Sequence, residues 1–137
     1  MCAIVGIVNG GEVAPLLVKS IARLEYRGYD SCGVATLNGS GIEERKDAGG
    51  VEEVACRQGL ACARGNLGIA RTRWATHGGV SQANPHPHLS CDGSFAVVHN
   101  GIITNHSALR AALQCQRHRF TSGTDTEVIA HLHSKKF

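Results

Sequence analysis

The chain begins MCAIVGIV, Met1 to Val8, and this stretch sets the start of the fold. Residues 2–8 are rich in Ile and Val and run into the turn signal Asn9-Gly10-Gly11, which predicts a short buried β-strand. Cys2 stands at the head of that strand. A cysteine can pack there simply as a small apolar residue. If Met1 is removed, however, Cys2 carries both a thiol nucleophile and a free α-amino group.

Outward from this strand, helical and extended patterns are mixed along the chain. Apolar spacing and capping residues predict helices at 13–24, 51–62, 105–113 and 124–132. Strands are predicted at 32–37, 42–46, 67–73 and 94–99. Asn105 is a plausible cap for its helix, and Thr124 with Glu127 has the spacing of a capping box. Hairpin-length connections early in the chain favour an α+β fold with mainly antiparallel sheet.

Composition narrows the class of protein. The 137 residues, 42% of them hydrophobic and 18% charged, suit one globular domain of ordinary size. No apolar run approaches the roughly 18 to 20 residues that cross a bilayer, and no signal peptide is recognisable. The net charge of +3 is small and dispersed, so we expect no nucleic-acid or membrane partner. Six cysteines without a CxxC pair favour reduced thiols in the cytoplasm.

The eight histidines raise the question of a metal site. His86, His88 and Cys91 lie close together in a polar loop, and zinc accepts both nitrogen and thiolate ligands. Their spacing matches no pattern of definite geometry. His131 and His133, two apart on a predicted helix, point to different faces and cannot share an ion from there. The sequence therefore predicts neither a metal nor a cofactor.

Several stretches together carry a specific resemblance along nearly the whole chain. They are MCAIVGIV, RLEYRGYDSCGVA, GIARTRWATHGG, NPHPH, VVHNGIITNH and TDTEVIAHL. In this order they resemble the N-terminal glutaminase domain of the glucosamine-6-phosphate synthases, also called glutamine:fructose-6-phosphate aminotransferases (isomerizing). That family belongs to the class II, N-terminal-nucleophile amidotransferases. The resemblance implies a four-layer αββα sandwich, of which residues 1–137 would form a C-terminally truncated glutaminase domain.

The resemblance also implies an activity. Members hydrolyse L-glutamine to L-glutamate and pass the ammonia to fructose 6-phosphate, which yields D-glucosamine 6-phosphate. Fructose 6-phosphate would bind only through two C-terminal sugar-isomerase domains, which this sequence lacks. Intact members are commonly homo-oligomers through those same domains. We therefore expect a cytoplasmic, cofactor-free chain that carries at most the glutaminase half of the reaction.

The same resemblance implies the catalytic groups. Cys2, freed of Met1, would attack the side-chain amide carbon of glutamine to form a thioester. Its own α-amino group would serve as the base, because an α-amine with a pKa of about 7.7 to 8.0 is partly neutral near physiological pH. The Asn100 side-chain amide and the Gly101 backbone N–H would stabilise the oxyanion.

Substrate recognition is implied in the same way. Arg73 suits the glutamine α-carboxylate because its planar guanidinium can bond both oxygens, and Asp125 would hold the α-ammonium. Gly28 would let its loop approach the nucleophile closely. Two further residues, Thr76 and His77, resemble pocket-wall and positioning residues. Trp74 resembles the residue between the glutamine pocket and the ammonia route.

Two alternatives remain at this point. The chain could be the glutaminase domain of another class II enzyme, such as amidophosphoribosyltransferase, although that family typically has Gln where Tyr29 stands and lacks the WATHG string. It could also be a non-catalytic, glutamine-binding remnant. This second alternative is motivated by the short C-terminus and by Ala3, where the family usually has Gly beside the nucleophile.

Overall fold

The protein, a computed structural model in which residues 2–74 and 81–134 are described, is built around one antiparallel sheet. Four strands, β1 (Ala3–Val8), β2 (Ser31–Asn38), β3 (Gly41–Ala48) and β4 (Leu67–Arg73), lie in the order β1-β4-β2-β3. A second, two-stranded sheet pairs β5 (His88–Leu89) with β6 (Ala96–Val97). All the strand pairs of the described residues are antiparallel, which confirms the expected α+β class.

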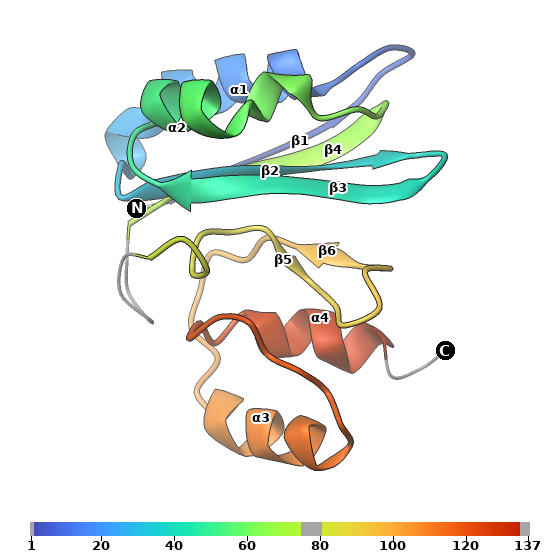
Figure 1. The fold of residues 1–137 in the computed structure, drawn as a ribbon. Helices are drawn as coiled ribbons and strands as arrows, with labels where there is room; N and C mark the ends of the chain where they lie inside the picture. The colour runs from blue at the N-terminus through green and yellow to red at the C-terminus, as the bar shows by residue number, and fades with distance from the viewer. Residues whose placement is uncertain (1, 75–80, 135–137) are drawn as a thin grey trace.

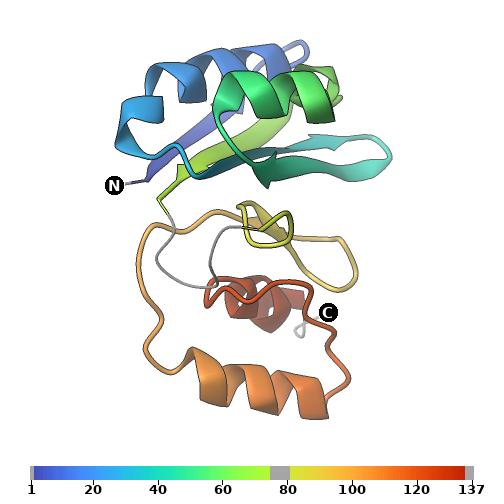
Figure 2. The ribbon, with the colours of Figure 1, turned by 60° about the vertical axis from the view of Figure 1, so that its left-hand side comes forward.

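The helices lie on both outer sides of this arrangement. Helices α1 (Ala14–Arg23) and α2 (Val51–Gln58) cover one face of the main sheet (Figure 1). The β5–β6 sheet faces the opposite side, followed by α4 (Glu127–Ser134) and then α3 (His106–Cys115), as the turned view in Figure 2 also shows. Short 3-10 turns at Glu25–Arg27 and Leu60–Cys62 follow α1 and α2.

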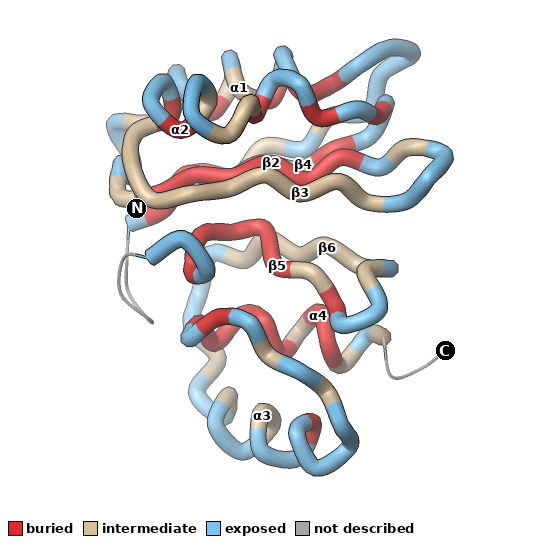
Figure 3. The backbone as a smooth tube through the Cα atoms, in the orientation of Figure 1, coloured by how far each residue is buried: buried red, intermediate tan, exposed pale blue. Residues whose placement is uncertain are grey.

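Side chains of the main sheet alternate between an apolar and a polar layer. Val34 and Ala70 are fully buried against Leu17 and Ile21 of α1, in the core between sheet and helices. The alternating residues of β4, Arg71 and Arg73, therefore point to the opposite face. They are also buried, because the second sheet covers that face (Figure 3).

The two layers meet closely at one glycine. A Cβ atom added to Gly33 of β2 would lie only 2.4 Å from the backbone oxygen of His86, in the segment before β5. That distance leaves no room for any side chain at position 33. The contact fixes the segment 84–90 against the face of the sheet that carries Arg71 and Arg73.

Most of the expected elements are confirmed, although some of their bounds and caps differ. The expected helix at 51–62 is split at Gly59, whose left-handed φ of 61° ends α2. The strand expected at 94–99 is reduced to Ala96–Val97, and β5 was not expected. Asn105 makes no side-chain cap bond, so its predicted capping role was wrong. The described residues contain no helix long and apolar enough to cross a membrane.

The predicted capping box was also wrong. The carboxylate of Glu127 accepts the backbone N–H groups of Thr121 and Ser122, each at 2.8 Å, instead of capping with Thr124. The Thr124 hydroxyl bonds His88 Nε2 at 2.8 Å. Glu127 therefore ties the loop before α4 to the helix, and Thr124 joins that loop to β5.

Candidate active site

The candidate nucleophile lies where β1 begins and β4 ends. Ala3 pairs with Thr72, so Cys2 reaches the end of β4 just beyond the last pair of this ladder. The Trp74 N–H donates a hydrogen bond to Cys2 Sγ at 3.2 Å, and the Trp74 carbonyl oxygen lies 3.7 Å from the same sulfur. Cys2 is buried, with 6% of its surface exposed. The sulfur is thus held against the backbone of residue 74.

Gly28 packs on the peptide group that precedes this contact. A Cβ atom at position 28 would lie 2.9 Å from both the Arg73 carbonyl carbon and the Trp74 nitrogen. The backbone at Gly28 is extended, with φ at 175°, so close approach and not an unusual φ requires glycine here. The Asp30 N–H then donates to the Arg73 carbonyl at 3.0 Å, which holds the loop in place.

Asn100 comes to Cys2 from the other end of the chain. Its side-chain amide donates to the Cys2 carbonyl oxygen at 3.3 Å, across 98 positions of sequence. The amide has two N–H groups, so one can hold Cys2 while the other is available to a ligand. Gly101 follows directly, and a Cβ atom there would lie 2.7 Å from the Nε2 atom of His99.

Two buried side chains of opposite charge interact electrostatically with each other, and the cation also interacts with Cys2. Arg73 is 2% exposed and Asp125 is 4% exposed. Burial lowers the pKa of Arg73 and the neighbouring Arg71 lowers it further, while Cys2, Asp30 and Asp125 act in the opposite direction. Asp125 is positioned by the Ile103 N–H, which donates to its Oδ2 atom at 2.7 Å. A buried cation paired with a buried anion can bind a zwitterionic α-amino acid.

Three expected residues remain, namely Trp74, Thr76 and His77. Trp74 is 47% exposed, and its ring meets Tyr29 edge to face with centroids 5.5 Å apart. Thr76 and His77 lie outside the described residues. The structure therefore brings together Cys2, Gly28, Arg73, Asn100 and Asp125, with Trp74 at the edge of the group.

A second buried cysteine, Cys32, differs from Cys2 in its surroundings. Cys32 points into the core under the helices, and burial, supported by Glu25 and Asp47, raises the pKa of its thiol to about 12. A thiol of that pKa is not nucleophilic at neutral pH. The other four cysteines are exposed and form no disulfide.

A separate cavity does not touch this site. It has a volume of about 570 Å³ and is lined by residues that include Gly10, Asn38 and Arg64, at the far ends of β1 and β2. Cys2 lies at the opposite end of β1. The cavity is open and lacks buried charged groups, so its size does not indicate the chemical site.

A cluster that the sequence did not predict lies near β5. Cys91 is grouped with His118 and His131, and not with His86 and His88, which are nearer to it in the sequence. His88 Nε2 instead meets Thr124, and the rings of His86 and His88 pack on each other. The three grouped residues come from separate segments of the chain, so no local spacing could have indicated them.

Comparison with known proteins adds a family to this geometry. The sequence profile described as "Glutamine amidotransferase domain" matches residues 55–136. The glutamine--fructose-6-phosphate aminotransferase [isomerizing] of Aeropyrum pernix is 50% identical over 135 residues, which cover 96% of this chain and 22% of that protein. The protein of the same name from Shewanella oneidensis is 51% identical over 132 residues, with the same coverage. The chain thus spans less than a quarter of the length of these relatives.

Solved structures show the same architecture. The glutamine phosphoribosylpyrophosphate amidotransferase of B. subtilis, complexed with ADP and GMP, superposes with a TM-score of 0.80 at 28% identity. It covers 98% of this chain, which corresponds to 29% of that protein. A structure described as the allosteric regulatory enzyme of purine biosynthesis gives a TM-score of 0.79 at 31% identity, covering 98% of this chain and 30% of that one.

Proposed function

This chain belongs to the glutamine amidotransferase domain family, and we propose that it is the glutaminase part of a glutamine:fructose-6-phosphate aminotransferase (isomerizing). Relatives of that name are about 50% identical over nearly the whole chain, against 28% and 31% for the two solved structures. L-glutamine is then the substrate, and L-glutamate and ammonia are the products. Fructose 6-phosphate would be bound by domains outside these 137 residues. The cytoplasm is the proposed location, on the basis of the free cysteines.

The proposed architecture is the four-layer αββα sandwich of N-terminal-nucleophile hydrolases. The order of layers supports it: α1 and α2, the main sheet, the β5–β6 sheet, and α4 with α3 (Figures 1 and 2). In this proposal residues 1–137 form an incomplete glutaminase domain. The candidate site lies where the two sheets meet, at the start of β1.

The proposed reaction begins once Met1 has been removed. Cys2 Sγ attacks the side-chain amide carbon of glutamine, and the thiol proton passes to the free α-amino group. The tetrahedral intermediate collapses as its C–N bond breaks, and the leaving nitrogen takes that proton and departs as ammonia. Water then attacks the thioester, which releases glutamate and restores the thiol. The backbone N–H of Trp74, 3.2 Å from the sulfur, stabilises thiolate character during attack and release.

Asn100 and Gly101 would stabilise the oxyanion of that intermediate. The bond from Asn100 to the Cys2 carbonyl keeps the amide beside the nucleophile, so its second N–H needs little reorganisation. The Gly101 backbone N–H is the proposed second donor. Loss of one such donor typically raises the barrier by roughly 3 to 4 kcal/mol.

Arg73 and Asp125 would select glutamine by its two backbone charges. Arg73 would take the α-carboxylate and Asp125 the α-ammonium, which leaves the side-chain amide directed at Cys2. Gly28 would permit the close approach of its loop. Thr76 and His77 are proposed as pocket residues, and Trp74 as the wall toward the ammonia route.

The observation that carries this proposal is the pair of hydrogen bonds that join Cys2 to Trp74 and Asn100. The test is release of glutamate and ammonia from glutamine by the purified chain, with removal of Met1 verified by intact mass. We expect Cys2→Ser to lower the rate by more than about 10³-fold, because the oxygen nucleophile is far weaker than the thiolate. Equal rates for the two proteins, or no release by the parent chain, would contradict the proposal.

A further inference from the structure

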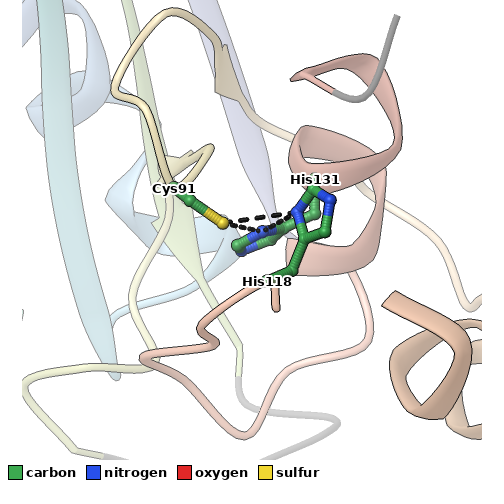
Figure 4. Close-up of side chains that lie close together, drawn as sticks. All are labelled: Cys91, His118 and His131. Atoms are coloured by element: carbon green, nitrogen blue, oxygen red, sulfur yellow. Dashed lines mark hydrogen bonds between the residues drawn. The ribbon is translucent and has the colours of Figure 1, made fainter. Parts of the chain in front are cut away.

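Three side chains, none of them among the candidate active-site residues, converge at the β5–β6 turn (Figure 4). Cys91 lies in that turn, His118 in the loop after α3, and His131 on α4. Cys91 Sγ lies 2.8 Å from His131 Nδ1 and 3.3 Å from His118 Nδ1. The two Nδ1 atoms are 3.2 Å apart. One donor atom from each element therefore faces a common point.

A carboxylate fixes the orientation of the buried histidine. His131 Nε2 lies 3.3 Å from Glu127 Oε1, and both side chains are 1% exposed. That carboxylate accepts hydrogen bonds from the N–H groups of Thr121 and Ser122. It is therefore also the acceptor, and His131 the donor, in the contact between the two side chains. Nε2 then carries the proton, and the lone pair on Nδ1 points at Cys91. A carboxylate behind a histidine is the arrangement by which proteins orient metal-binding imidazoles.

The other two groups are also held by their own backbone. Asp92 accepts the Ser94 N–H at 3.1 Å, and the Gly93 N–H bonds the Ser90 carbonyl at 3.0 Å, which closes the turn around Cys91. The His118 N–H donates to the Leu113 carbonyl at 3.1 Å, at the C-terminal end of α3. Hydrogen bonds thus hold the segment that carries each of the three side chains in place.

We propose that Cys91, His118 and His131 bind a zinc ion. Zinc–sulfur and zinc–nitrogen bonds of about 2.3 and 2.0 to 2.1 Å in a tetrahedron place sulfur and nitrogen about 3.6 Å apart, and two nitrogens about 3.3 Å apart. The separations of 3.3 and 3.2 Å that involve His118 are close to these values. The contact of 2.8 Å between Cys91 and His131 has to open by less than 1 Å on binding.

In this proposal the fourth ligand is a water molecule. A cavity of about 310 Å³ beside the cluster is lined by Cys91 and Glu127, among others. Three protein ligands of the Cys and His type with one open position are a known zinc arrangement. Nitrogen and thiolate donors also favour zinc over magnesium or calcium, which prefer oxygen.

An activated thiol is the competing explanation for part of this cluster. Cys91, His131 and Glu127 alone have the order of a thiol, a base and an orienting carboxylate. That arrangement has no use for His118, whose Nδ1 lies within 3.3 Å of both partner atoms. Two imidazole nitrogens directed at one sulfur are better explained by a shared cation.

The experiment is a titration of the reduced full chain with Zn²⁺ against a chromophoric chelator, together with Co²⁺ as a spectroscopic probe. We expect one equivalent of metal, a thiolate-to-cobalt charge-transfer band, and a higher melting temperature with zinc. Cys91→Ser should weaken binding by more than about 100-fold and abolish the band. Cys115→Ser, at an exposed cysteine on α3, is the matched control and should leave both unchanged.

His118→Gln separates the two explanations. Zinc coordination predicts that it weakens binding of the metal strongly, while His133→Gln, on α4 but outside the cluster, has no effect. Equal metal affinity of the parent and Cys91→Ser would overturn the proposal. So would a Cys91 thiol whose rapid alkylation depends on His131 and is unaffected by excess Zn²⁺. These readouts do not involve glutamine hydrolysis, so they are independent of the proposed function.

Discussion

The geometry around Cys2 depends on the single peptide group between Arg73 and Trp74. Its N–H reaches the Cys2 sulfur at 3.2 Å, and its other side is covered by the backbone of Gly28. A Cβ atom at position 28 would be 2.9 Å from two atoms of this peptide, and neither belongs to a side chain that could move aside. The position of the nucleophile is therefore coupled to the absence of a side chain on a loop residue.

Gly28→Ala is expected to reduce alkylation of Cys2 by a glutamine analogue by about 10- to 100-fold. The physical reason is displacement of the Arg73–Trp74 peptide, because shifts near 1 Å at a reacting group cost up to about 100-fold in rate. The measurement is the pseudo-first-order rate of labelling. Gly10→Ala is the matched control, since a Cβ atom there meets nothing within 4 Å. Equal rates for the two variants would count against this coupling.

The identity of the candidate site residues was easier to predict from the sequence than their contacts in space. The sequence identified Cys2, Arg73, Asn100 and Asp125 by resemblance, and the structure brings them together. Their spacing could not have done so, because 98 positions separate Cys2 from Asn100. Such contacts come from the packing of sheets, which no local pattern encodes.

At the scale of elements, the end of α3 shows strain at one residue. His118 N–H bonds the Leu113 carbonyl and Arg117 N–H bonds the Gln114 carbonyl, the pairing of a Schellman motif. The motif places Arg117 at a φ of 70°, the position that usually holds glycine. Arginine therefore occupies a left-handed conformation that its Cβ atom disfavours.

Arg117→Gly is expected to stabilise the protein by about 0.5 to 1 kcal/mol, because glycine removes the steric cost at this φ. Part of that gain is offset, since glycine loses more backbone entropy on folding than arginine does. Urea unfolding of the parent and the variant measures the difference. Arg119→Gly is a suitable control, since Arg119 is also exposed and does not have a positive φ. A variant at position 117 that is no more stable than the one at 119 would contradict this account.

Elements with strong periodicity were predicted well, and those set by tertiary contacts were not. The strand at 67–73 matches β4 at both ends, because the small residues Gly68, Ala70 and Thr72 alternate with larger ones over its whole length. The capping box failed because Glu127 is drawn to the N–H groups of Thr121 and Ser122. Only the path of that loop across the second sheet, which the sequence does not reveal, places them there.

At the scale of the whole molecule, the two sheets enclose a polar layer with neutral histidines. Burial lowers the pKa of His88 to about 3, with Lys46 adding to the effect. Burial and Arg71 also lower the pKa of His86 well below its usual range. The native protein therefore leaves both rings uncharged at pH values where the unfolded chain protonates them.

This arrangement predicts loss of stability in mild acid. The unfolded chain binds a proton at His88 below a pKa of about 6.5, but the folded state does so only near 3, so stability falls as the pH drops between these values. The slope is at most about 1.4 kcal/mol per pH unit for each such histidine. Urea unfolding between pH 6.5 and 4.5 should show a shallower decline for His88→Gln than for the parent. Parallel declines would mean that His88 is not the source.

The whole arrangement was only partly accessible from the sequence. The α+β class followed from mixed elements with short connections, and the resemblance supplied the order of layers. The cluster of Cys91, His118 and His131 did not follow, because three segments that are separate in sequence meet only when α4 packs under the second sheet. Tertiary packing therefore creates the candidate zinc site, where the sequence had predicted no metal.

The most direct test of the central claim is covalent labelling with 6-diazo-5-oxo-norleucine, a glutamine-analogue electrophile, followed by intact-mass and peptide mass spectrometry. The account predicts one adduct, on an N-terminal Cys2 that has lost Met1. Excess glutamine should block it, and Cys2→Ala should not form it. Cys32, buried with a pKa raised to about 12, should stay unlabelled. Adducts scattered over the exposed cysteines, or no adduct with Met1 retained, would contradict the claim that these residues assemble a working glutaminase site.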